Sequence, residues 1–489
     1  MKKFALFMGS GLGALMVFMV LRTLFMESPQ INVAPLQPVS VEELSAIDHL
    51  AAALRFRTIS SGEASSPTSF SSQPFLLLHN SLEQFFPTSY GTLTKEIVAE
   101  KSLLFKWQGS TEALDPILLL AHLDVVPVEA ETEGLWTHPP FAGHVEDGYI
   151  WGRGALDDKI RVLAILEAID MLLKEGFRPQ RSVYLAFGHD EEVGGREGAR
   201  NIASLLQQRG IEFELVLDEG GAITTKVIPS VREPVALIGI AEKGYLTLEL
   251  AVTEEGGHSS MPPPHTAIGI LSAAIVRLES HQFASRIDGG TAQFLESLAP
   301  VMPFGYRTVL ANLWFFSPLL KFYLASQPTT NATIRTTLAA TIFKSGTREN
   351  ILPQQARAVI NLRILPGDTL EEVTKEIQRV INDPRVRVRQ VGVAREPSGQ
   401  SRIDSWGYTQ LEQTIRQVFP HVLVAPFVVL GGTDSYHYQD IAQDIYRFSP
   451  IFVPKADLKR IHGTNERIAI QDYLACVRFY YYFIRNVSA

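Results

Sequence analysis

The stretch from Trp151 to Lys159, WGRGALDDK, places two aspartates directly before an apolar segment with helical spacing. Gly152 and Gly154 permit a tight turn, so Asp157 and Asp158 are expected at the N-terminus of that helix. Helix capping is the commoner role of an aspartate at such a position. Metal binding is the alternative, and it makes Asp157 the candidate centre of a two-metal site, because other stretches supply matching donors.

Four further stretches end apolar, strand-like runs with residue types that bind metals. They contain His122 with Asp124, Glu191 with Glu192, Asp218, and His462. Each is weak alone, since adjacent glutamates more often form a solvated turn; only their coincidence predicts a site. On an extended chain His122 and Asp124 point to one face, where the carboxylate can hydrogen-bond the imidazole edge that faces away from a metal.

The combined donors predict a pair of divalent ions. The expected ligands are His122, Asp157, Glu192, Asp218 and His462. Two imidazoles and three carboxylates suit zinc, with cobalt or manganese as alternatives. Two divalent ions against three carboxylates leave one positive charge, which should lower the pKa of a bridging water and provide a hydroxide nucleophile. Glu191 is free beside a ligand and is therefore the candidate general base.

Three short apolar runs predict buried strands, and helical patterns separate them. The strands are expected at 116–121, 182–187 and 213–217, and the helices at 159–175 and 199–208. This alternation predicts an α/β catalytic domain with a mixed, mainly parallel sheet flanked by helices. Ligands of such sheets collect beyond the carboxyl ends of the strands, where the histidine and acidic residues fall.

The pattern changes near Ile238. Strand-like alternation at 245–252 and 356–365, with a helical pattern at 267–278, predicts an inserted α+β domain. The expected parts are a catalytic domain at 40–239, the insert at 240–367, with its return at Pro366 and Gly367, and a second catalytic part at 368–489. Within the insert, the strongly apolar stretch 309–325 is open to three interpretations: core, substrate channel or membrane-facing patch.

The N-terminus predicts membrane targeting. Lys2 and Lys3 precede an apolar run, residues 4–21, that is about long enough to cross a bilayer. Residues 1–26 are expected to be a signal anchor, or else a cleavable signal peptide, followed by a linker at 27–39. The anchor predicts a single-pass membrane protein with its catalytic domain outside the cytoplasm, whereas cleavage predicts a secreted or periplasmic protein.

Composition excludes several classes of function. A chain of 489 residues favours two domains, and its formal charge of -8, without basic blocks, argues against a nucleic-acid partner. The single cysteine, Cys476, excludes an internal disulfide and a cysteine-rich zinc site. Neither the G-x-S-x-G elbow of serine hydrolases nor a phosphate-binding P-loop occurs.

Five stretches, in this order, resemble the M20 family of co-catalytic zinc peptidases and amidohydrolases. They are HLD at 122–124, WGRGALDDK at 151–159, HDEEVGG at 189–195, LDEGG at 217–221 and IHGTNE at 461–466. The resemblance implies two zinc ions bridged by Asp157, Glu191 as base, and an inserted lid through which a homodimer can form. It also implies a peptide or N-acyl amino acid substrate. A non-catalytic binding protein on this fold is the rival interpretation, but no catalytic position is missing.

Further residues resemble the family's substrate-binding positions. His258 in GGHSSMPP resembles a lid histidine that often serves the partner's active site, and Asn350 and Arg363 resemble substrate contacts. Arg363 suits a carboxylate. Gly431, Gly432, Thr433 and Asp434 resemble the family's glycine-rich substrate loop. From the residues alone, His258 would be a surface histidine and Arg363 a salt-bridge partner.

The N-terminal segment, LDEGG and the apolar insert are most similar to the carboxypeptidase S branch of the family, which includes enzymes that make or cleave N-acyl amino acids. The apolar insert would suit a fatty-acyl chain or an apolar side chain.

Overall fold

The computed structural model describes residues 2–60 and 72–488. Its catalytic domain is built on a ten-stranded mixed sheet in the order β1-β2-β6-β3-β7-β17-β9-β8-β18, with β16 beside β9. The strands are β1 (Thr94–Val98), β2 (Ser102–Trp107), β3 (Ile117–His122), β6 (Val183–Gly188), β7 (Phe213–Asp218), β8 (Ile223–Thr225), β9 (Val235–Glu242), β16 (Leu423–Val429), β17 (Ala442–Arg447) and β18 (Phe452–Pro454). The three strands expected from the apolar runs are confirmed as β3, β6 and β7, which pair in parallel.

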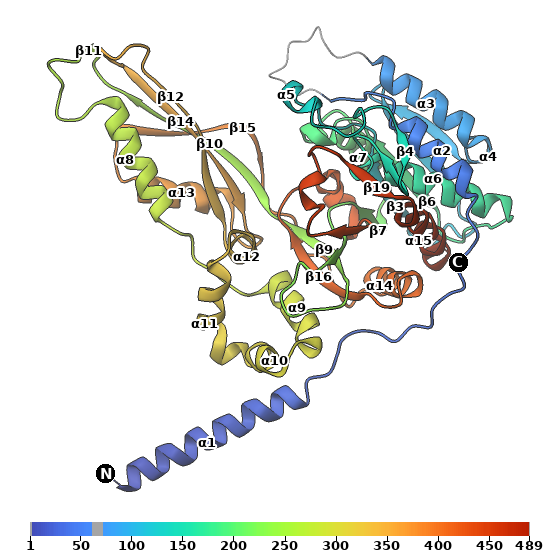
Figure 1. Cartoon of the computed structure of the whole chain (residues 1–489), viewed down its shortest axis with the longest axis horizontal. Helices are drawn as coiled ribbons and strands as arrows, with labels where there is room; N and C mark the ends of the chain where they lie inside the picture. The colour runs from blue at the N-terminus through green and yellow to red at the C-terminus, as the bar shows by residue number, and fades with distance from the viewer. Residues whose placement is uncertain (1, 61–71, 489) are drawn as a thin grey trace.

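Helices cover both faces of this sheet (Figure 1). One layer contains α2 (Glu43–Ala53), α3 (Gln73–Phe85), α4 (Pro87–Thr92), α6 (Lys159–Lys174), α14 (Trp406–Val418) and α15 (Ile470–Ser488). The other contains α7 (Ala199–Gln208) and the 3-10 helix η3 (Asp434–Ile441). Along β3, Ile117 and Leu119 face the first layer and Leu118 and Leu120 face the second, so this central strand is apolar on both sides. The helices expected at 159–175 and 199–208 are confirmed as α6 and α7.

The lid is a four-stranded antiparallel sheet in the order β12-β14-β10-β15. Its strands are β10 (Gly244–Thr253), β12 (Thr337–Ser345), β14 (Gln355–Ile364) and β15 (Val386–Arg395). Every second residue of β10 and β14 is buried against α8 (Ala267–Ser280) and α13 (Leu370–Ile381). At its tip, β11 (Gly257–His258) pairs with β13 (Ile351–Leu352).

The expected domain boundary at 367 is wrong. Pro366 and Gly367 form a turn inside the lid, because α13 packs on the lid core and β15 pairs with β10. The chain returns after β15, where Ser398 N donates to Glu242 O and Ser401 N donates to Ile240 O. The two crossings between domains therefore lie side by side at 242–244 and 395–398.

The middle of the insert also leaves the lid. Helix α9 (Gly289–Leu298) packs against β16 of the catalytic sheet, and Leu295 and Leu298 share a cluster with Val235 and Ala425. The 3-10 helix η2 (Ala299–Val301), α10 (Phe304–Ala311), α11 (Leu313–Ala325) and α12 (Pro328–Ile334) follow. No residue of α11 is buried, so the interpretation of 309–325 as core is wrong for this helix.

Helix α1 (Lys2–Leu24) lies beside α10 at one end of the molecule (Figure 1). Within residues 11–60 and 72–488, no single helix is both long and apolar enough to cross a membrane. Together α10 and α11 meet those criteria, but the pair is bent by 113°. The membrane-spanning helix expected at the N-terminus stays a prediction.

Candidate active site

Parallel strands bring three of the predicted motifs to one sheet edge. His122 ends β3, Glu191 begins the 3-10 helix η1 (Glu191–Val193) just after β6, and Asp218 ends β7. Because β3, β6 and β7 run in the same direction, their carboxyl ends meet, and the residues that follow them lie together.

A small sheet positions the two remaining motifs. It contains β4 (His144–Glu146), β5 (Tyr149–Trp151) and β19 (Arg467–Ala469), and it joins the turn before α6 to the loop that carries His462. The buried Glu466 carboxylate accepts hydrogen bonds from Gly154 N at 3.0 Å and Leu156 N at 2.8 Å. Glu466 also pairs with Arg153, whose other terminal nitrogen donates to His462 O at 3.1 Å. Glu466 therefore fixes both loops, a role that the sequence reasoning missed.

Asp157 lies between two imidazoles. Its Oδ1 is 2.9 Å from His122 Nε2, and its Oδ2 is 2.9 Å from His462 Nε2, which also lies 3.2 Å from Glu192 Oε2. Each oxygen of one carboxylate thus faces a different group of donors. A carboxylate shared between two cations requires this arrangement.

The pKa values of the aspartate and the two histidines are shifted in the directions expected for oppositely charged side chains in contact. Burial acts to raise the pKa of Asp157, but hydrogen bonds with His122 and His462 hold it well below its usual range. Burial acts to lower the pKa of His122, but hydrogen bonds with Asp124, Asp157 and Glu219 raise it well above its usual value. Hydrogen bonds with Asp157 and Glu192 raise the pKa of His462 to about 10. The carboxylates therefore strongly stabilise positive charge at this site, whether protons or metal ions carry it.

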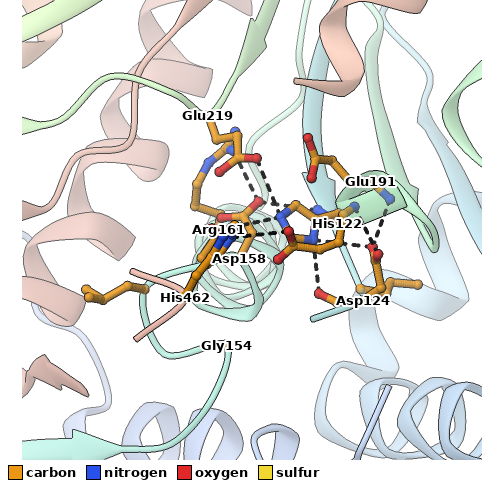
Figure 2. Close-up of polar contacts among 12 residues, drawn as sticks. His122, Asp124, Gly154, Asp158, Arg161, Glu191, Glu219 and His462 are labelled. Atoms are coloured by element: carbon orange, nitrogen blue, oxygen red, sulfur yellow. Dashed lines mark hydrogen bonds and ion pairs between the residues drawn. The ribbon is translucent and has the colours of Figure 1, made fainter. Parts of the chain in front are cut away.

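At the predicted ligand position Asp218, the neighbouring Glu219 is the residue that faces the cluster. Glu219 Oε1 lies 3.5 Å from His122 Nε2, and Figure 2 shows Glu219 facing His122. The Asp218 carboxylate instead accepts hydrogen bonds from Ser435 N at 2.7 Å and Glu219 N at 2.8 Å, and it lies 3.6 Å from the Arg161 guanidinium. Adjacent residues at a strand end point to opposite sides, so only one carboxylate of LDEGG can face the site. The motif alone does not show which of its two carboxylates faces the site.

Asp158 occupies the N-cap position of α6, but its side chain makes no capping hydrogen bond. Its Oδ2 accepts from His122 N at 3.3 Å and from Arg161 at 3.2 Å. Asp158 therefore braces the strand end that carries His122.

Asp124 supports both the first histidine and the pair of glutamates. Its carboxylate lies 3.3 Å from His122 Nδ1 and accepts hydrogen bonds from Glu191 N and Glu192 N, each at 3.1 Å. Asp124 therefore contacts the imidazole edge as expected, but the shorter contact of Nδ1 is with the backbone oxygen of Asp124, at 3.0 Å. Among the described residues, no side chain hydrogen-bonds the Glu191 carboxylate, whose pKa is raised well above its usual value, first by burial and then by Glu219. Glu191 is thus free to exchange a proton (Figure 2).

The chemistry of the cluster fits divalent metal ions. Two imidazoles and three carboxylates converge, namely His122, His462, Asp157, Glu192 and Glu219. His122, Asp157 and Glu192 each offer an atom within 4.8 Å of the others. In addition, Glu192 Oε1 is buried and has no hydrogen-bond partner in the described parts of the chain. A buried carboxylate oxygen without a partner is costly, and a cation would satisfy it.

The glycine-rich loop lies against the base of the lid. Thr433 Oγ1 donates to the buried Glu242 at 2.6 Å, and Arg395 donates to Thr433 O at 3.4 Å. A Cβ atom on Gly432 would lie 1.2 Å from an Arg395 nitrogen, so the Arg395 guanidinium packs directly on this loop and would have to move for any larger residue. Two strands away from Arg395, the Arg363 guanidinium lies 4.7 Å from the centre of the Tyr245 ring. Within the described chain no carboxylate pairs with Arg363, whose charged neighbour is Arg395, so the interpretation of this residue as a salt-bridge partner is wrong.

His258 and Asn350 do not join this cluster. Both are exposed at the lid tip, where His258 Nδ1 accepts from Ser260 N at 3.1 Å and Asn350 O accepts from Ser259 N at 3.2 Å. Figure 1 places β11 at the end of the lid farthest from the catalytic sheet. The structure therefore does not bring the two predicted lid residues to the metal-binding groups of the same chain.

Comparisons with known proteins agree with this architecture. The model of the peptidase family M20/M25/M40 matches residues 118–486. The chain is 40% identical over 482 residues to the probable carboxypeptidase S-like 2 of Dictyostelium discoideum, covering 97% of this chain and 92% of that protein. It is 43% identical over 413 residues to the human N-fatty-acyl-amino acid synthase/hydrolase PM20D1, covering 83% of this chain and 81% of that protein.

A similar fold occurs in the M20 metallo-carboxypeptidase Sso-CP2 of Sulfolobus solfataricus, with a TM-score of 0.63 at 19% identity, covering 91% of this chain and 99% of that one. The order of the motifs, the buried cluster of donors and these relatives lead to one conclusion: the chain belongs to the M20 peptidase family and is an M20-type hydrolase.

Proposed function

We propose that this hydrolase depends on two zinc ions and cleaves a peptide or N-acyl amide bond next to a free carboxylate. The observation that supports it best is the position of Asp157, whose two oxygens each lie 2.9 Å from a different imidazole. His122 and Glu219 would serve one ion, His462 and Glu192 the other, with Asp157 between them. Cobalt or manganese could replace zinc at such donors.

Bound ions would polarise the amide carbonyl and make water a stronger nucleophile. The chain itself must then move one proton. Glu191 accepts it from the attacking water and delivers it to the nitrogen of the leaving amine as the C–N bond breaks. The Asp124 carboxylate accepts the backbone N–H of Glu191 and so holds this residue in place.

The substrate carboxylate is proposed to bind at the base of the lid. Arg363 is half-buried there without a carboxylate partner among the described residues, and desolvation lowers its pKa. An incoming carboxylate would restore the favourable environment of the guanidinium. Gly432 and Thr433 would line the same region, because Arg395 packs directly on this loop.

A panel of substrates tests this proposal. Dipeptides, N-acetyl amino acids and long-chain N-acyl amino acids should be cleaved only with a free carboxylate, and a chelator should abolish turnover until zinc, cobalt or manganese is restored. Long-chain substrates are the finer alternative, since a relative is named an N-fatty-acyl-amino acid synthase/hydrolase. Equal turnover of acetyl and long acyl chains would contradict that alternative, and incubation of a fatty acid with an amino acid tests synthesis.

His258 and Asn350 are proposed to serve the active site of a second copy in a homodimer formed through the lid. A complementation experiment tests this arrangement. Glu191→Gln and His258→Ala are each expected to be nearly inactive, but their mixed dimer contains one intact site. Random exchange of subunits should therefore restore about a quarter of wild-type activity. No recovery, with exchange verified by tagged subunits, would contradict the arrangement.

Residues 1–26 are proposed to anchor the protein in a membrane with the catalytic domain outside the cytoplasm. Removal of this segment by a signal peptidase, giving a secreted or periplasmic protein, is the alternative. Protease protection of intact cells, together with the N-terminal sequence of the mature chain, distinguishes the two.

A further inference from the structure

Helices α10 and α11 expose an unusual number of large apolar side chains. Those on the outer surface are Phe304, Tyr306, Trp314, Phe315, Leu319, Phe322 and Tyr323, here called the apolar platform. Leu319 is 61% exposed and Phe322 is 78% exposed. Contiguous patches of this kind on soluble proteins mark contacts with a partner or a membrane.

Only a narrow side of α11 is used for packing. Leu313 and Leu320 contact the small cluster around α9, and Phe316 and Leu324 are half-buried, whereas the platform residues of this helix are exposed. The sharp bend between α10 and α11 prevents a straight crossing of a bilayer. A bent, apolar pair of short helices is suited instead to lying in the plane of a membrane surface.

The platform continues onto α1. The Phe18 and Trp314 rings lie 6.3 Å apart between centroids, and Asn312 Nδ2 donates to Met19 O at 3.2 Å. Met16 and Val17 are also exposed on α1. The three helices gather at one end of the molecule, away from the catalytic sheet (Figure 1). The platform is therefore adjacent to the segment proposed as the membrane anchor.

The charge of this region is opposite to that of the whole chain. The chain carries a formal charge of -8, yet residues 297–348 contain no acidic residue. Their charged residues are all basic. Arg307, Lys321 and Arg335 lie on α10, on α11 and directly after α12, whereas Lys344 and Arg348 lie on β12 and beyond it, toward the lid tip. Arg22 adds a further exposed positive charge on α1. Basic side chains beside exposed tryptophan and tyrosine match the anionic headgroup layer of a bilayer.

We infer that the apolar platform rests on the surface of a bilayer containing anionic lipids. The segment of the chain that follows the platform leads directly to the proposed carboxylate site. Lys243 Nζ donates to Ala332 O at 2.9 Å and Arg335 O at 2.8 Å, just before β12, whose Thr337 lies opposite Arg363. An N-acyl amino acid in the leaflet, with its carboxylate at the surface, could reach Arg363 from this side. This step rests on the proposed function, whereas contact with the bilayer does not.

Tryptophan quenching by lipid tests the contact directly. The full chain is reconstituted into phosphatidylcholine–phosphatidylglycerol vesicles whose acyl chains carry bromine, and the contribution of Trp314 is the difference from Trp314→Phe. That contribution should be quenched by more than half, as expected for an indole at the interface. The matched control is Trp406, which is 37% exposed on α14 of the catalytic domain and should not be quenched.

Other results of this experiment overturn the inference. Quenching of Trp314 by aqueous iodide but not by brominated lipid would place the platform in water. Absence of quenching by either would mean that protein, such as a second copy of the chain, covers it.

A pair of variants tests the functional step. Leu319→Glu with Phe322→Glu should lower hydrolysis of a vesicle-embedded long-chain substrate about tenfold and leave a soluble N-acetyl substrate unchanged. Leu76→Glu with Leu77→Glu, on exposed positions of α3, is the control and should change neither rate. Equal losses on both substrates, or no loss on the embedded one, would contradict delivery from the bilayer. If the wild type hydrolyses neither substrate, the proposed function fails while the lipid quenching still decides the contact.

Discussion

The two sides of the active site differ in how completely one chain builds them. On the metal-facing side, Asp124 and Glu466 hold the strand ends and loops that carry the donors. On the lid side, Arg363 has no carboxylate partner among the described residues, and His258 is exposed at the lid tip. The first side is ready for its ligands within a single chain. If the proposed roles of Arg363 and His258 hold, substrate, lid movement or a partner copy would complete the second.

Loss of the proposed general base, Glu191, should have the largest effect on turnover. Glu191→Gln is expected to lower turnover by about 1,000-fold, because the amide cannot accept the proton of the attacking water. Metal content should remain that of the wild type, since Glu191 faces the cluster without joining it. Activity within a few-fold of wild type would remove Glu191 from its role.

The second prediction distinguishes the roles of the adjacent carboxylates of Glu219 and Asp218. Glu219→Gln is expected to lower the metal affinity and to reduce kcat/KM about 100-fold, because an amide is a poor ligand beside His122. Asp218→Asn should chiefly destabilise the fold by about 2 kcal/mol, since the two oxygens of the buried Asp218 accept the backbone N–H groups of Ser435 and Glu219, and an asparagine oxygen can replace only one of them. Metal titration and thermal unfolding of both variants decide this assignment; loss of metal in Asp218→Asn alone would reverse it.

These two residues also show what the sequence could and could not predict. The order of the motifs and the apolar strands predicted that His122, Glu191 and the LDEGG motif meet at one sheet edge, because parallel strands end together. Which carboxylate of LDEGG faces the site depends on how the strand end turns, and the motif alone does not contain that information.

The prediction of the domain boundary at 367 was wrong for a related reason. The sequence pattern predicts that Pro366 and Gly367 mark the return to the catalytic domain; they do form a turn, but a turn does not show which sheet the next strand joins. Strand β15 pairs with β10, and that pairing keeps α13 in the lid. The apolar stretch 309–325 was similarly ambiguous, because hydropathy does not distinguish a buried helix from one whose apolar side chains are exposed.

A smaller effect is expected on the lid side. Arg363→Met should raise the KM of an N-acyl amino acid and lower kcat/KM by about 30-fold, because the substrate carboxylate loses a charged partner. The same substitution should leave an N-acyl amide that lacks the carboxylate unaffected. Steady-state kinetics on the two substrates provide the readout, and equal losses on both would indicate a structural role.

The smallest effect concerns the fold of the lid itself. Thr369 forms a capping box with Glu372 at the start of α13. Thr369→Ala should lower the free energy of unfolding by about 1 kcal/mol, because an N–H at the helix start loses its acceptor. Turnover should be unchanged at temperatures where the variant is folded. A large loss of turnover would show that the stability of the lid affects the metal-facing side, so that the two sides of the active site are not independent.

The most direct test of the account is the number of metal ions bound per chain, measured by elemental analysis of the wild type, Glu191→Gln and Asp157→Asn. We predict two divalent ions per chain in the first two proteins. In Asp157→Asn both ions should be weakened together, because one carboxylate faces both groups of donors. A wild type that binds a single ion, or an Asp157→Asn variant that keeps both, would contradict the proposed two-metal centre.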